Sequence, residues 1–600
     1  MKSFSRLISL PLVVIVPFFY GHASAQDQPV HPNKIKNGTY LGLSPPLRDL
    51  PKITMAEIKE MELRYKENPL NEWPAPSYPF KATAQPQGND PIWQAAMGNM
   101  SNLAATVINF AGQSGNADPL DPNGVVGPNH YMQTINSVYA IYNKTGTLLA
   151  GPTDLNLLFG NLLGTNCNDG DPIMLYDEQA NRYLCAEFSL CNPNDRMLIA
   201  ISQTNDPTGS WHRYSFDVDD VPDYMKFGIW RDAYYMGTNT HAVGSDDIYA
   251  FDRSQMLNGN NAQMVSFDNP WRPATYQGVQ CALPVDNDGE FAPIGTPGNF
   301  LILNNDAIAG GTDQLWIFEM AVDWITPANS TFNRVQQLNV PAFDSDFGSN
   351  WDNIAQYGTA QELLSVSDLI MNVPQFRSFS GQQSIVLCHT VDVNNTDRAG
   401  MRWYELLRTS GSWSIRQSGT YSPDANSRWM GSIHMNGHKE IGLAYSISSS
   451  SMYPGIRYCG QDAIEYAKAS GVMNVAEATI QTGAYSKTWG NRWGDYSSLF
   501  VDPVDDRTFW YTQMFEGPVT QETRIAAFTI YPSSIYVDKT AALGGNGTLA
   551  SPIRTVTQAL GALGPGTNVY IKSNTYDEAN PMLINQNGLW NSYNGASIVK

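Results

Sequence analysis

Two stretches far apart in the chain, Arg428-Trp429-Met430-Gly431-Ser432 and Arg492-Trp493-Gly494-Asp495-Tyr496-Ser497, are almost alike, and each opens an apolar run that ends in a turn. Self-similarity of this kind indicates a repeated structural unit. Short apolar and aromatic runs, separated by Gly, Pro, Asn and Asp clusters, continue over residues 116–531 with almost no helical periodicity. Such runs are typical of β-strands joined by turns. The sequence therefore predicts a repetitive all-β domain.

The length of this domain favours a seven-bladed β-propeller, because about 400 residues are too many for one sandwich and give about 60 residues per blade. We predict that each blade has one innermost strand. The predicted innermost strands are residues 124–136, 170–177, 228–237, 294–304, 382–391, 428–436 and 492–502. Residues that open these strands are expected at one end of a shared central channel.

The start of the chain resembles an export signal. Lys2 and Arg6 precede an apolar run over residues 7–20, and Ala23-Ser24-Ala25 follows it. A charged, apolar and small-residue order is typical of a secretory signal peptide, so we expect cleavage after Ala25 and a secreted or cell-surface protein. No later segment offers about 18 consecutive apolar residues, so no transmembrane segment is predicted.

Changes in composition divide the rest of the chain. Residues 26–115 are rich in Pro, Asn, Gln and Lys, with one short helical pattern at residues 55–65, and are predicted to form an extended N-terminal arm. The predicted propeller spans residues 116–531, and a small C-terminal module spans residues 532–600.

The chain is acidic, with 36 Lys and Arg against 56 Asp and Glu and a net charge of −20. An acidic surface repels nucleic acid, which is therefore excluded as a partner. Six cysteines are present. An even number in an exported protein favours disulfides over a metal site, and their connectivity stays open. Because Cys167, Cys185 and Cys191 are close in sequence, we expect one local bridge among them.

Several motifs extend the repeat. Residues 202–211 contain Asp206, Gly209 and Trp211 and resemble the turn that stabilises blades in sialidase-like propellers. Further motifs resemble a broad family of exported bacterial propeller proteins with no settled activity; they lie at residues 222–224, 228–235, 402–405, 420–424, 428–432 and 492–497. This resemblance covers about residues 116–530 and implies the fold, and it leaves the activity open.

The C-terminal module has a different texture. A strand-like run at residues 535–538, a Gly-rich turn at 544–548, a short helical run at 551–560 and a second strand-like run at 569–572 follow one another. This order resembles the opening of pectate-lyase-like parallel β-helices. The resemblance implies a β-helix-like module, and none of the cleaving residues of such lyases has a counterpart here.

Three Arg-Trp pairs are the candidate ligand-binding residues: Arg231 with Trp230, Arg428 with Trp429, and Arg492 with Trp493. Three guanidiniums at one channel mouth would form a receptor for the carboxylate of an acidic sugar, because Arg is a rigid bidentate donor. The indole rings would offer flat faces to sugar rings. The alternative is that each Arg pairs with a nearby Asp between blades while each Trp packs between sheets.

Cleavage of a glycosidic bond needs two carboxylates, or a Tyr with a carboxylate as in sialidases. The candidates for this role are Asp232, Glu405, Asp424, Asp495 and Tyr496. A lyase would instead use a His or Tyr base beside an Arg, and His130, His389 and His434 each lie within a predicted innermost strand.

Calcium is the only cofactor for which the sequence gives an argument. Asp118 and Asp121 lie in one Asp-Asn-Gly-rich turn, and Asp286 and Asp288 lie in another. Carboxylate and amide oxygens on turns are the ligands that Ca²⁺ prefers, although such clusters are also ordinary turns.

Two functions fit these observations. The first is a secreted or surface-exposed propeller that binds an acidic glycan or a surface protein without catalysis. The alternative is a carbohydrate-active enzyme, either a sialidase-like hydrolase or a polysaccharide lyase, that acts on an acidic sugar. Whether the chain is an enzyme therefore stays open at the level of the sequence.

Overall fold

The computed structural model describes most of the chain after the signal-like segment. The described residues are 28–54, 86, 88–99, 106–160, 168–190, 195–239, 244–271, 281–347, 353–532, 534–545, 547–564, 567–572, 574–576, 589–593 and 598–599. The predicted signal peptide and the helical pattern at 55–65 lie outside them. Among the described helices, none is long and apolar enough to cross a membrane.

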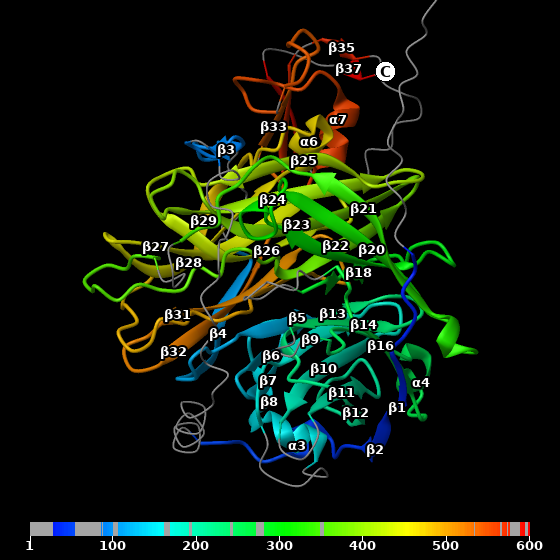
Figure 1. Ribbon diagram of the computed structural model, residues 1–600. Coiled ribbons are helices and arrows are strands. Elements are labelled where there is room, and N and C mark those ends of the chain that lie inside the picture. Colours follow the sequence, from blue (N-terminus) through cyan, green and yellow to red (C-terminus); the bar gives the residue numbers. More distant parts are fainter. Residues whose placement is uncertain are drawn as a thin grey trace, which may run out of the picture.

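Seven sheets in the described residues hold the predicted all-β domain, and we number them in chain order (Figure 1). Sheet 1 is β5 (Asn123–Val126), β6 (His130–Ile135), β7 (Val138–Asn143) and β8 (Leu148–Asp154). Sheet 2 is β9 (Ile173–Asp177), β10 (Arg182–Ser189), β11 (Arg196–Ser202), β12 (Trp211–Asp217) and β2 (Thr39–Leu43). Sheet 3 is β13 (Asp223–Ile229), β14 (Tyr234–Asn239), β15 (Ile248–Phe251), β16 (Gln263–Phe267) and β1 (Lys34–Asn37).

The remaining four sheets continue the same order. Sheet 4 is β17 (Leu283–Pro284), β19 (Gly298–Asn304), β20 (Gln314–Ala321) and β21 (Thr331–Asn339). Sheet 5 is β18 (Asp286–Asp288), β22 (Met371–Phe379), β23 (Gln382–Asp392), β24 (Ala399–Arg408), β25 (Ser414–Tyr421) and β3 (Trp93–Gln94). Sheet 6 is β26 (Ser427–Met435), β27 (Ile441–Ser449), β28 (Met452–Gln461) and β29 (Val475–Gln481), and sheet 7 is β30 (Ser498–Val501), β31 (Phe509–Glu516), β32 (Gln521–Phe528) and β4 (Ile108–Gly115).

These sheets form a closed ring. The strands β5, β9, β13, β17, β22, β26 and β30 contact one another in that order, and β30 contacts β5 again. Within each sheet the consecutive strands are antiparallel, apart from the added strands β18 and β3, which pair in parallel. A closed radial arrangement of antiparallel sheets is a β-propeller fold. The apolar core lies between neighbouring sheets, with large buried side chains such as Trp211, Trp403 and Trp429.

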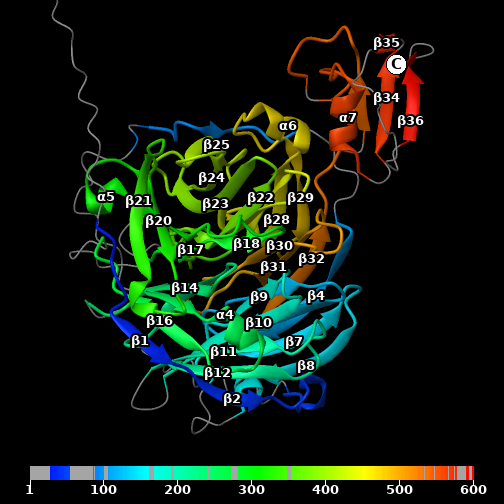
Figure 2. The same cartoon turned by 90° about the vertical axis from the view of Figure 1, so that its right-hand side faces the viewer.

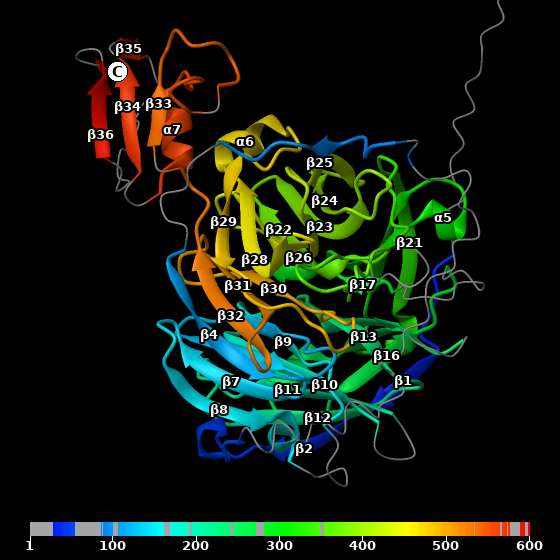
Figure 3. The same cartoon turned by 90° about the vertical axis from the view of Figure 1, so that its left-hand side faces the viewer.

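The N-terminal arm is part of the ring. Its strands β2, β1, β3 and β4 add to the outer edges of sheets 2, 3, 5 and 7. In Figures 1 and 3 the blue strands β1 and β2 run along the outside of the sheets, beside β16 and β12. Paired edges are protected from association with other chains. Asp90 anchors the arm further, since its carboxylate forms a buried ion pair with Arg402 at 2.5 Å.

The predicted innermost strands agree with the ring for some sheets. Residues 170–177, 428–436 and 492–502 contain β9, β26 and β30. The prediction for sheet 3 is shifted, because residues 228–237 span the turn from β13 to β14. In sheets 4 and 5 the predicted segments contain the second strands, β19 and β23. In both sheets the first strand and the second strand are mostly buried, so periodicity does not distinguish one from the other.

Irregular backbone recurs where innermost strands begin. The register shifts between Asp223 and Lys226 in β13, between Met371 and Gln375 in β22, and between Trp429 and Ser432 in β26. Positive φ angles occur in the same places, at Tyr224, Asn372 and Met430. Such bulges turn side chains out of the regular alternation of a strand, and they are common beside functional sites.

The C-terminal module stands beside sheets 5 to 7 (Figure 2). Its strands β33 (Ser534–Val537), β34 (Asn568–Lys572) and β36 (Leu589–Tyr593) are parallel, and β35 (Thr575–Tyr576) pairs in parallel with β37 (Ile598–Val599). The helix α7 (Val556–Ala562) contacts α6 (Ala463–Lys468), the helix that connects β28 to β29 in sheet 6. The other helices are short: α3 (Leu155–Phe159), α4 (Arg253–Leu257), α5 (Asp306–Ala309) and the 3₁₀ turns Leu47–Asp49 and Pro327–Asn329.

Candidate functional site

Charged side chains gather where innermost strands begin and where they finish. We call the end of the ring where the innermost strands begin the start end. There the Tyr496 hydroxyl donates to Asp171, and both residues lie just before a strand. We call the opposite end, where the innermost strands finish, the finish end. There Asp288 contacts Arg377 and His434, and all three residues lie late in their strands. Each end brings charges from several sheets together.

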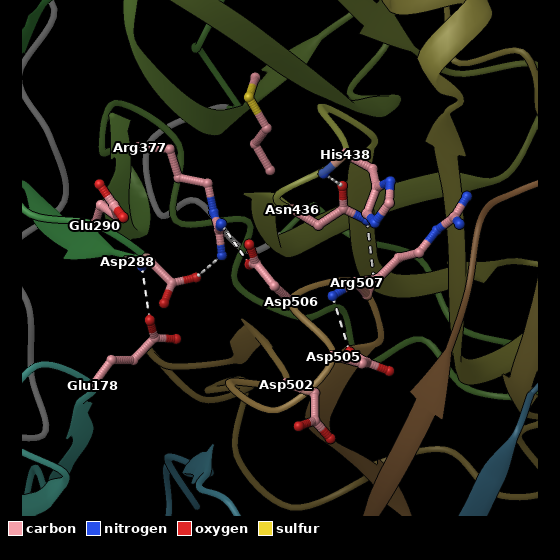
Figure 4. Close-up of polar contacts among 12 residues, drawn as sticks. Glu178, Asp288, Glu290, Arg377, Asn436, His438, Asp502, Asp505, Asp506 and Arg507 are labelled. Carbon is pink, nitrogen blue, oxygen red and sulfur yellow. Dashed lines mark hydrogen bonds and ion pairs between the residues drawn. The ribbon is translucent and has the colours of Figure 1, made fainter. Parts of the chain in front are cut away.

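At the finish end, Glu178 and Asp288 form a carboxyl pair (Figure 4). Glu178 directly follows β9, Asp288 ends β18, and their side chains are hydrogen-bonded. Burial, the charge of Asp288 and this hydrogen bond raise the pKa of Glu178 to about 10. The backbone N–H of Gly289 donates to Glu178 Oε2 at 2.9 Å. Glu178 therefore holds a proton at neutral pH, and its half-buried side chain reaches solvent.

Arg377 keeps Asp288 ionised at neutral pH. Arg377 Nη2 lies 2.6 Å from Asp288 Oδ2, and His434 Nε2 lies 3.2 Å from the same oxygen. Burial alone would raise the pKa of Asp288, but the charge of Arg377 and hydrogen bonds from Glu178 and Arg377 hold it well below its usual range. Adjacent carboxyls with pKa values pushed apart are the arrangement that separates an acid from a base.

His434 is the buried member of this group. Burial and the charge of Arg377 lower its pKa to about 4, against the opposing charge of Asp288. The ring is fully buried, so it has no direct access to a substrate. This position does not suit His434 as the base of a lyase, the role that the sequence had offered for it.

Local backbone geometry holds these groups together. The strand β18 pairs in parallel with β22 and places Asp288 opposite Arg377. Gly437 lies directly against Asp506: a Cβ there would lie 1.9 Å from Asp506 Oδ2 and would displace that side chain, and the Gly437 N–H donates to the Asp506 carbonyl at 2.9 Å. Asp506 itself has a φ of 50°. The turn after β30 is therefore fixed against the end of β26.

The rim of this end is open to solvent. Asp506 bonds Arg377 Nη1 at 2.5 Å, and its side chain is 52% exposed. Figure 4 shows Arg377 between Asp288 and Asp506, with Glu178 on the far side of Asp288. Arg231 is exposed, donates to the Ala292 carbonyl at 3.0 Å, and lies 5.0 Å from the centre of the Phe291 ring. An exposed guanidinium beside an aromatic ring suits a sugar that carries a carboxylate.

The start end carries a more deeply buried group, which we call the closure cluster. It consists of Asp121, Asp171, Asp223, Tyr224, Lys226, Arg492, Asp495 and Tyr496, from sheets 1, 2, 3 and 7. The Asp495 N–H donates to Asp121 Oδ1 at 2.7 Å, so the last sheet is bonded to the first. Lys226 Nζ lies 3.4 and 3.5 Å from the ring centres of Tyr224 and Tyr496.

In the closure cluster, the pKa values of Asp171 and Lys226 are both shifted toward neutral pH. Burial and the charges of Asp223 and Asp495 raise the pKa of Asp171 to about 7. Burial lowers the pKa of Lys226 to about 8, against the charges of its neighbours. Burial and nearby carboxylates also raise the pKa values of Asp121 and Asp495. Of the four aspartates, Asp171 is the half-buried one.

The three predicted arginines are not brought to one end. Arg231 lies in the turn after β13, at the finish end, whereas Arg492 precedes β30 at the start end. Arg428 is fully buried and bonds Asp424 at 2.9 Å and Glu477 at 2.8 Å. Arg492 forms an ion pair with Asp495. The alternative role, pairing with a nearby Asp, thus describes Arg428 and Arg492, while Arg231 keeps an exposed guanidinium.

The three predicted tryptophans are buried rather than displayed. Trp230, Trp429 and Trp493 are all at most 1% exposed. The indole N–H groups of Trp230 and Trp493 donate to the Thr296 carbonyl and to Ser446 Oγ. Trp429 and Trp493 pack with their ring centres 5.8 Å apart, so the echo between the two motifs joins neighbouring sheets 6 and 7.

The predicted catalytic residues are dispersed. Asp232 accepts a hydrogen bond from Tyr235 at 2.9 Å, and Asp424 bonds Arg428. Glu405 is buried and bonds Arg416 at 2.8 Å and Tyr466 at 2.9 Å. Asp495 and Tyr496 share the closure cluster, where the Tyr496 hydroxyl donates to Asp171 Oδ2 at 2.9 Å. Among them, the structure brings only this last pair together.

The aspartates predicted for calcium have protein partners. Asp118 bonds Lys487, Asp121 accepts from Asn136 and Asp495, Asp286 accepts from the Ile229 N–H, and Asp288 bonds Arg377. Within the described ranges, no group of three or more His, Cys, Asp and Glu side chains is arranged to hold a metal ion. The prediction of calcium thus has no described site.

The predicted disulfides are not formed by the four described cysteines. Cys185, Cys281, Cys388 and Cys459 are buried as thiols. Cys185 therefore takes no part in the local bridge expected among Cys167, Cys185 and Cys191, because its side chain lies inside the core between sheets 1 and 2. Cys167 and Cys191 lie outside the described residues.

Glu178, Arg377 and Lys226 were missed by the sequence interpretation. Glu178 follows the predicted strand 170–177, so its position at a strand end is a usable signal. Arg377 and Lys226 lie in β22 and β13, whose first residues were not predicted as innermost strands. Both lie inside apolar strands, and only the closed ring shows that Arg377 meets Asp288 at the finish end and that Lys226 belongs to the closure cluster at the start end.

Comparison with known proteins gives distant structural likenesses only. No protein-family model and no curated protein matches the chain. An ulvan lyase bound to -[GlcA(1-4)Rha3S]- is 13% identical, with 71% of this chain and 96% of that chain covered and a TM-score of 0.37. A second polysaccharide lyase is 9% identical over 74% and 100% of the chains, with a TM-score of 0.32. An endo-arabinase from Bacteroides thetaiotaomicron is 12% identical over 60% and 94%, with a TM-score of 0.24.

Proposed function

We propose that this chain is a carbohydrate-active enzyme that hydrolyses an acidic glycan at the finish end of the ring. The proposal rests on one observation above all: a protonated Glu178 is hydrogen-bonded to an ionised Asp288 at a solvent-accessible position. A carboxyl that keeps its proton at neutral pH is the group a glycosidic oxygen needs when it leaves.

The roles follow from the positions. Glu178 donates its proton to the leaving oxygen, which ends its hydrogen bond to Asp288, and the Gly289 N–H stabilises the Glu178 carboxylate that forms. Asp506 is a second, half-exposed carboxylate on the other side of Arg377, and it activates the attacking water. Arg231 and Phe291 at the rim bind the carboxylate and the ring of the sugar. A lyase is less well supported at this end of the ring, because the histidine found here, His434, is buried.

A non-catalytic glycan-binding propeller is the second candidate. The exposed Arg231 beside Phe291 supports it equally well, because binding needs the rim and not the proton of Glu178. The two candidates therefore differ in what they expect from a change at Glu178. We further propose that the seven sheets are seven blades, that the parallel C-terminal strands are a β-helix-like module, and that the chain is exported after cleavage at Ala25.

The test uses the mature chain with acidic and neutral polysaccharides. Released reducing ends report hydrolysis, and ultraviolet absorbance of an unsaturated sugar reports a lyase. We expect reducing ends from an acidic polysaccharide without the unsaturated product. Glu178→Gln should lower the rate by about 10²–10⁴-fold, the usual contribution of a positioned acid.

A matched control is Glu522→Gln in β32 of sheet 7, which should keep full activity. Full activity of Glu178→Gln would remove Glu178 from the mechanism. Binding of an acidic polysaccharide that depends on Arg231, with no cleavage of any substrate, would replace the enzyme by the binding protein. Mass measurement of the secreted chain tests whether it begins at Gln26.

A further inference from the structure

The closure cluster joins the last sheet of the ring to the first three. Asp121 precedes β5, Asp171 precedes β9, Asp223 and Lys226 lie in β13, and Asp495 precedes β30. A direct bond across the seam runs from the Asp495 N–H to Asp121 Oδ1, and the Tyr496 hydroxyl bonds Asp171 Oδ2 from sheet 7 to sheet 2. The seam between sheet 7 and the first three sheets therefore contains charged side chains from all four of these sheets.

The cluster has more carboxylates than cations. Four aspartates face Lys226 and Arg492, and Arg492 is already paired with Asp495. Lys226 Nζ is buried between the Tyr224 and Tyr496 rings and has no hydrogen-bond partner in the described structure, so it balances the aspartates through space. Other titratable groups that face the cluster are Cys281 on the sheet 4 side, Cys388 of sheet 5 beside Tyr224, and Asp118 and Lys487 beside Arg492.

We propose that the closure cluster is an acid-tightened latch: the seam between sheet 7 and sheets 1 to 3 is held firmly at mildly acidic pH and loosens as the pH rises to neutral. Ionisation of Asp171 adds a negative charge beside Asp223 of sheet 3 and Asp495 of sheet 7, the two sides of the seam. Repulsion among buried carboxylates weakens contacts between the elements that carry them.

The direction of the pH effect follows from linkage. The pKa of Asp171 is raised to about 7, so the stability its proton contributes is full below the ordinary value near 4 and is lost as the pH rises through about 7. The pKa of Lys226 is lowered to about 8, so its contribution is lost as the pH falls through about 8 and is full only above the ordinary value of 10.5. The latch is therefore weakest at about pH 7 to 8.

Hydrogen exchange of backbone amides tests the latch without a substrate, so its outcome is independent of the proposed enzyme activity. Exchange of β4, β5, β30 and β32 is compared with exchange of β20 and β24, after correction for intrinsic rates. We expect protection of the seam strands to fall by up to about tenfold per pH unit between about pH 5 and pH 7, with little change in the comparison strands.

Two variants identify the group responsible. Asp171→Asn carries a permanent neutral side chain and should keep the seam protected across this range. Tyr496→Phe removes the hydrogen bond that favours the ionised form of Asp171 and should move the transition to higher pH. Asp217→Asn, at a half-exposed surface ion pair with Arg196, should leave the wild-type pattern unchanged. A seam that follows the comparison strands at every pH, or a pH dependence that survives in Asp171→Asn, overturns the proposal.

Discussion

The two ends of the ring contain the same kinds of side chain, acidic groups beside basic ones, but the pKa values of their carboxyls are shifted differently. At the finish end, one acid, Glu178, keeps its proton and its neighbour Asp288 stays ionised beside Arg377. At the start end, the carboxyls of Asp121, Asp171 and Asp495 all have raised pKa values around a single lysine. At the finish end one carboxyl is protonated and its neighbour is ionised, whereas at the start end several carboxyls have raised pKa values together.

The arrangement of cations explains this difference. Arg377 bonds Asp288 directly, so one carboxylate is stabilised selectively and its partner is driven to protonation. Lys226 bonds no carboxylate directly and acts on several through space. Selective stabilisation suits an acid that acts on a substrate, whereas shared stabilisation suits a seam that responds to pH.

The largest effect on stability is expected at Arg377. Arg377→Met leaves Asp288 buried and charged without its guanidinium, which should lower the free energy of unfolding by about 3–5 kcal/mol. Denaturant unfolding at neutral pH measures it. The control Arg196→Met removes an exposed ion pair with Asp217 and should cost about 1 kcal/mol or less. Equal losses in the two variants would mean that Arg377 does not hold Asp288 in its ionised state.

A smaller loss is expected at the start end. Lys226→Met removes the buried ammonium and its contacts with two tyrosine rings, but the carboxyls around it can take up protons. We expect a loss of about 1–3 kcal/mol at about pH 7.5, and a smaller one at about pH 5, where those carboxyls are already protonated. Denaturant unfolding at both pH values measures the difference. A loss that does not depend on pH would show that the aspartates stay ionised around Lys226.

The sequence predicts the ring well and its ends poorly. The echo of Arg428-Trp429 with Arg492-Trp493 indicates neighbouring repeats, and the two indole rings do pack together between sheets 6 and 7. The same residues were weaker guides to a site. Arg428 bonds Glu477 in β29, the outermost strand of its sheet.

Placing a residue at one end of the ring requires knowing which strand is innermost. Arg231 illustrates this, since a shift of one strand moves it from the start end to the finish end. Asp286 and Asp288 illustrate a second limit. Their spacing on a turn is typical of oxygen ligands, yet β18 adds to sheet 5 and gives Asp288 the Arg377 side chain instead of a cation.

The pH dependence of stability distinguishes the two ends. Glu178 has a pKa of about 10 against an ordinary value of 4.5, so its contribution is full below about pH 4.5 and is lost as the pH rises through about 10. Glu178→Gln should remove this slope at mildly alkaline pH. Because Glu178 is half-buried, we expect less than the limit of about 1.4 kcal/mol per pH unit for one proton.

Unfolding curves collected from acidic to alkaline pH check this, with Asp171→Asn as the matched variant at the other end. Asp171→Asn should flatten the curve only below about pH 7, and Glu178→Gln should also flatten it above about pH 8. If both variants changed the same window, the two ends would be one coupled system.

The smallest effect is expected at Asp506, where the finish end meets solvent. Its side chain is half-exposed, so Asp506→Asn should change the free energy of unfolding by about 1 kcal/mol or less. The charge of Asp506 nevertheless contributes to the raised pKa of Glu178, and its removal should lower that pKa. Carboxyl ¹³C titration by NMR measures this shift, and an unchanged Glu178 would mean that Arg377 screens it fully from the rim. A rim charge that tunes the acid while hardly affecting stability suits an acid that acts on a substrate, whereas Asp121 and Asp171 at the start end accept hydrogen bonds from sheet 7, so their charges also bear on the seam.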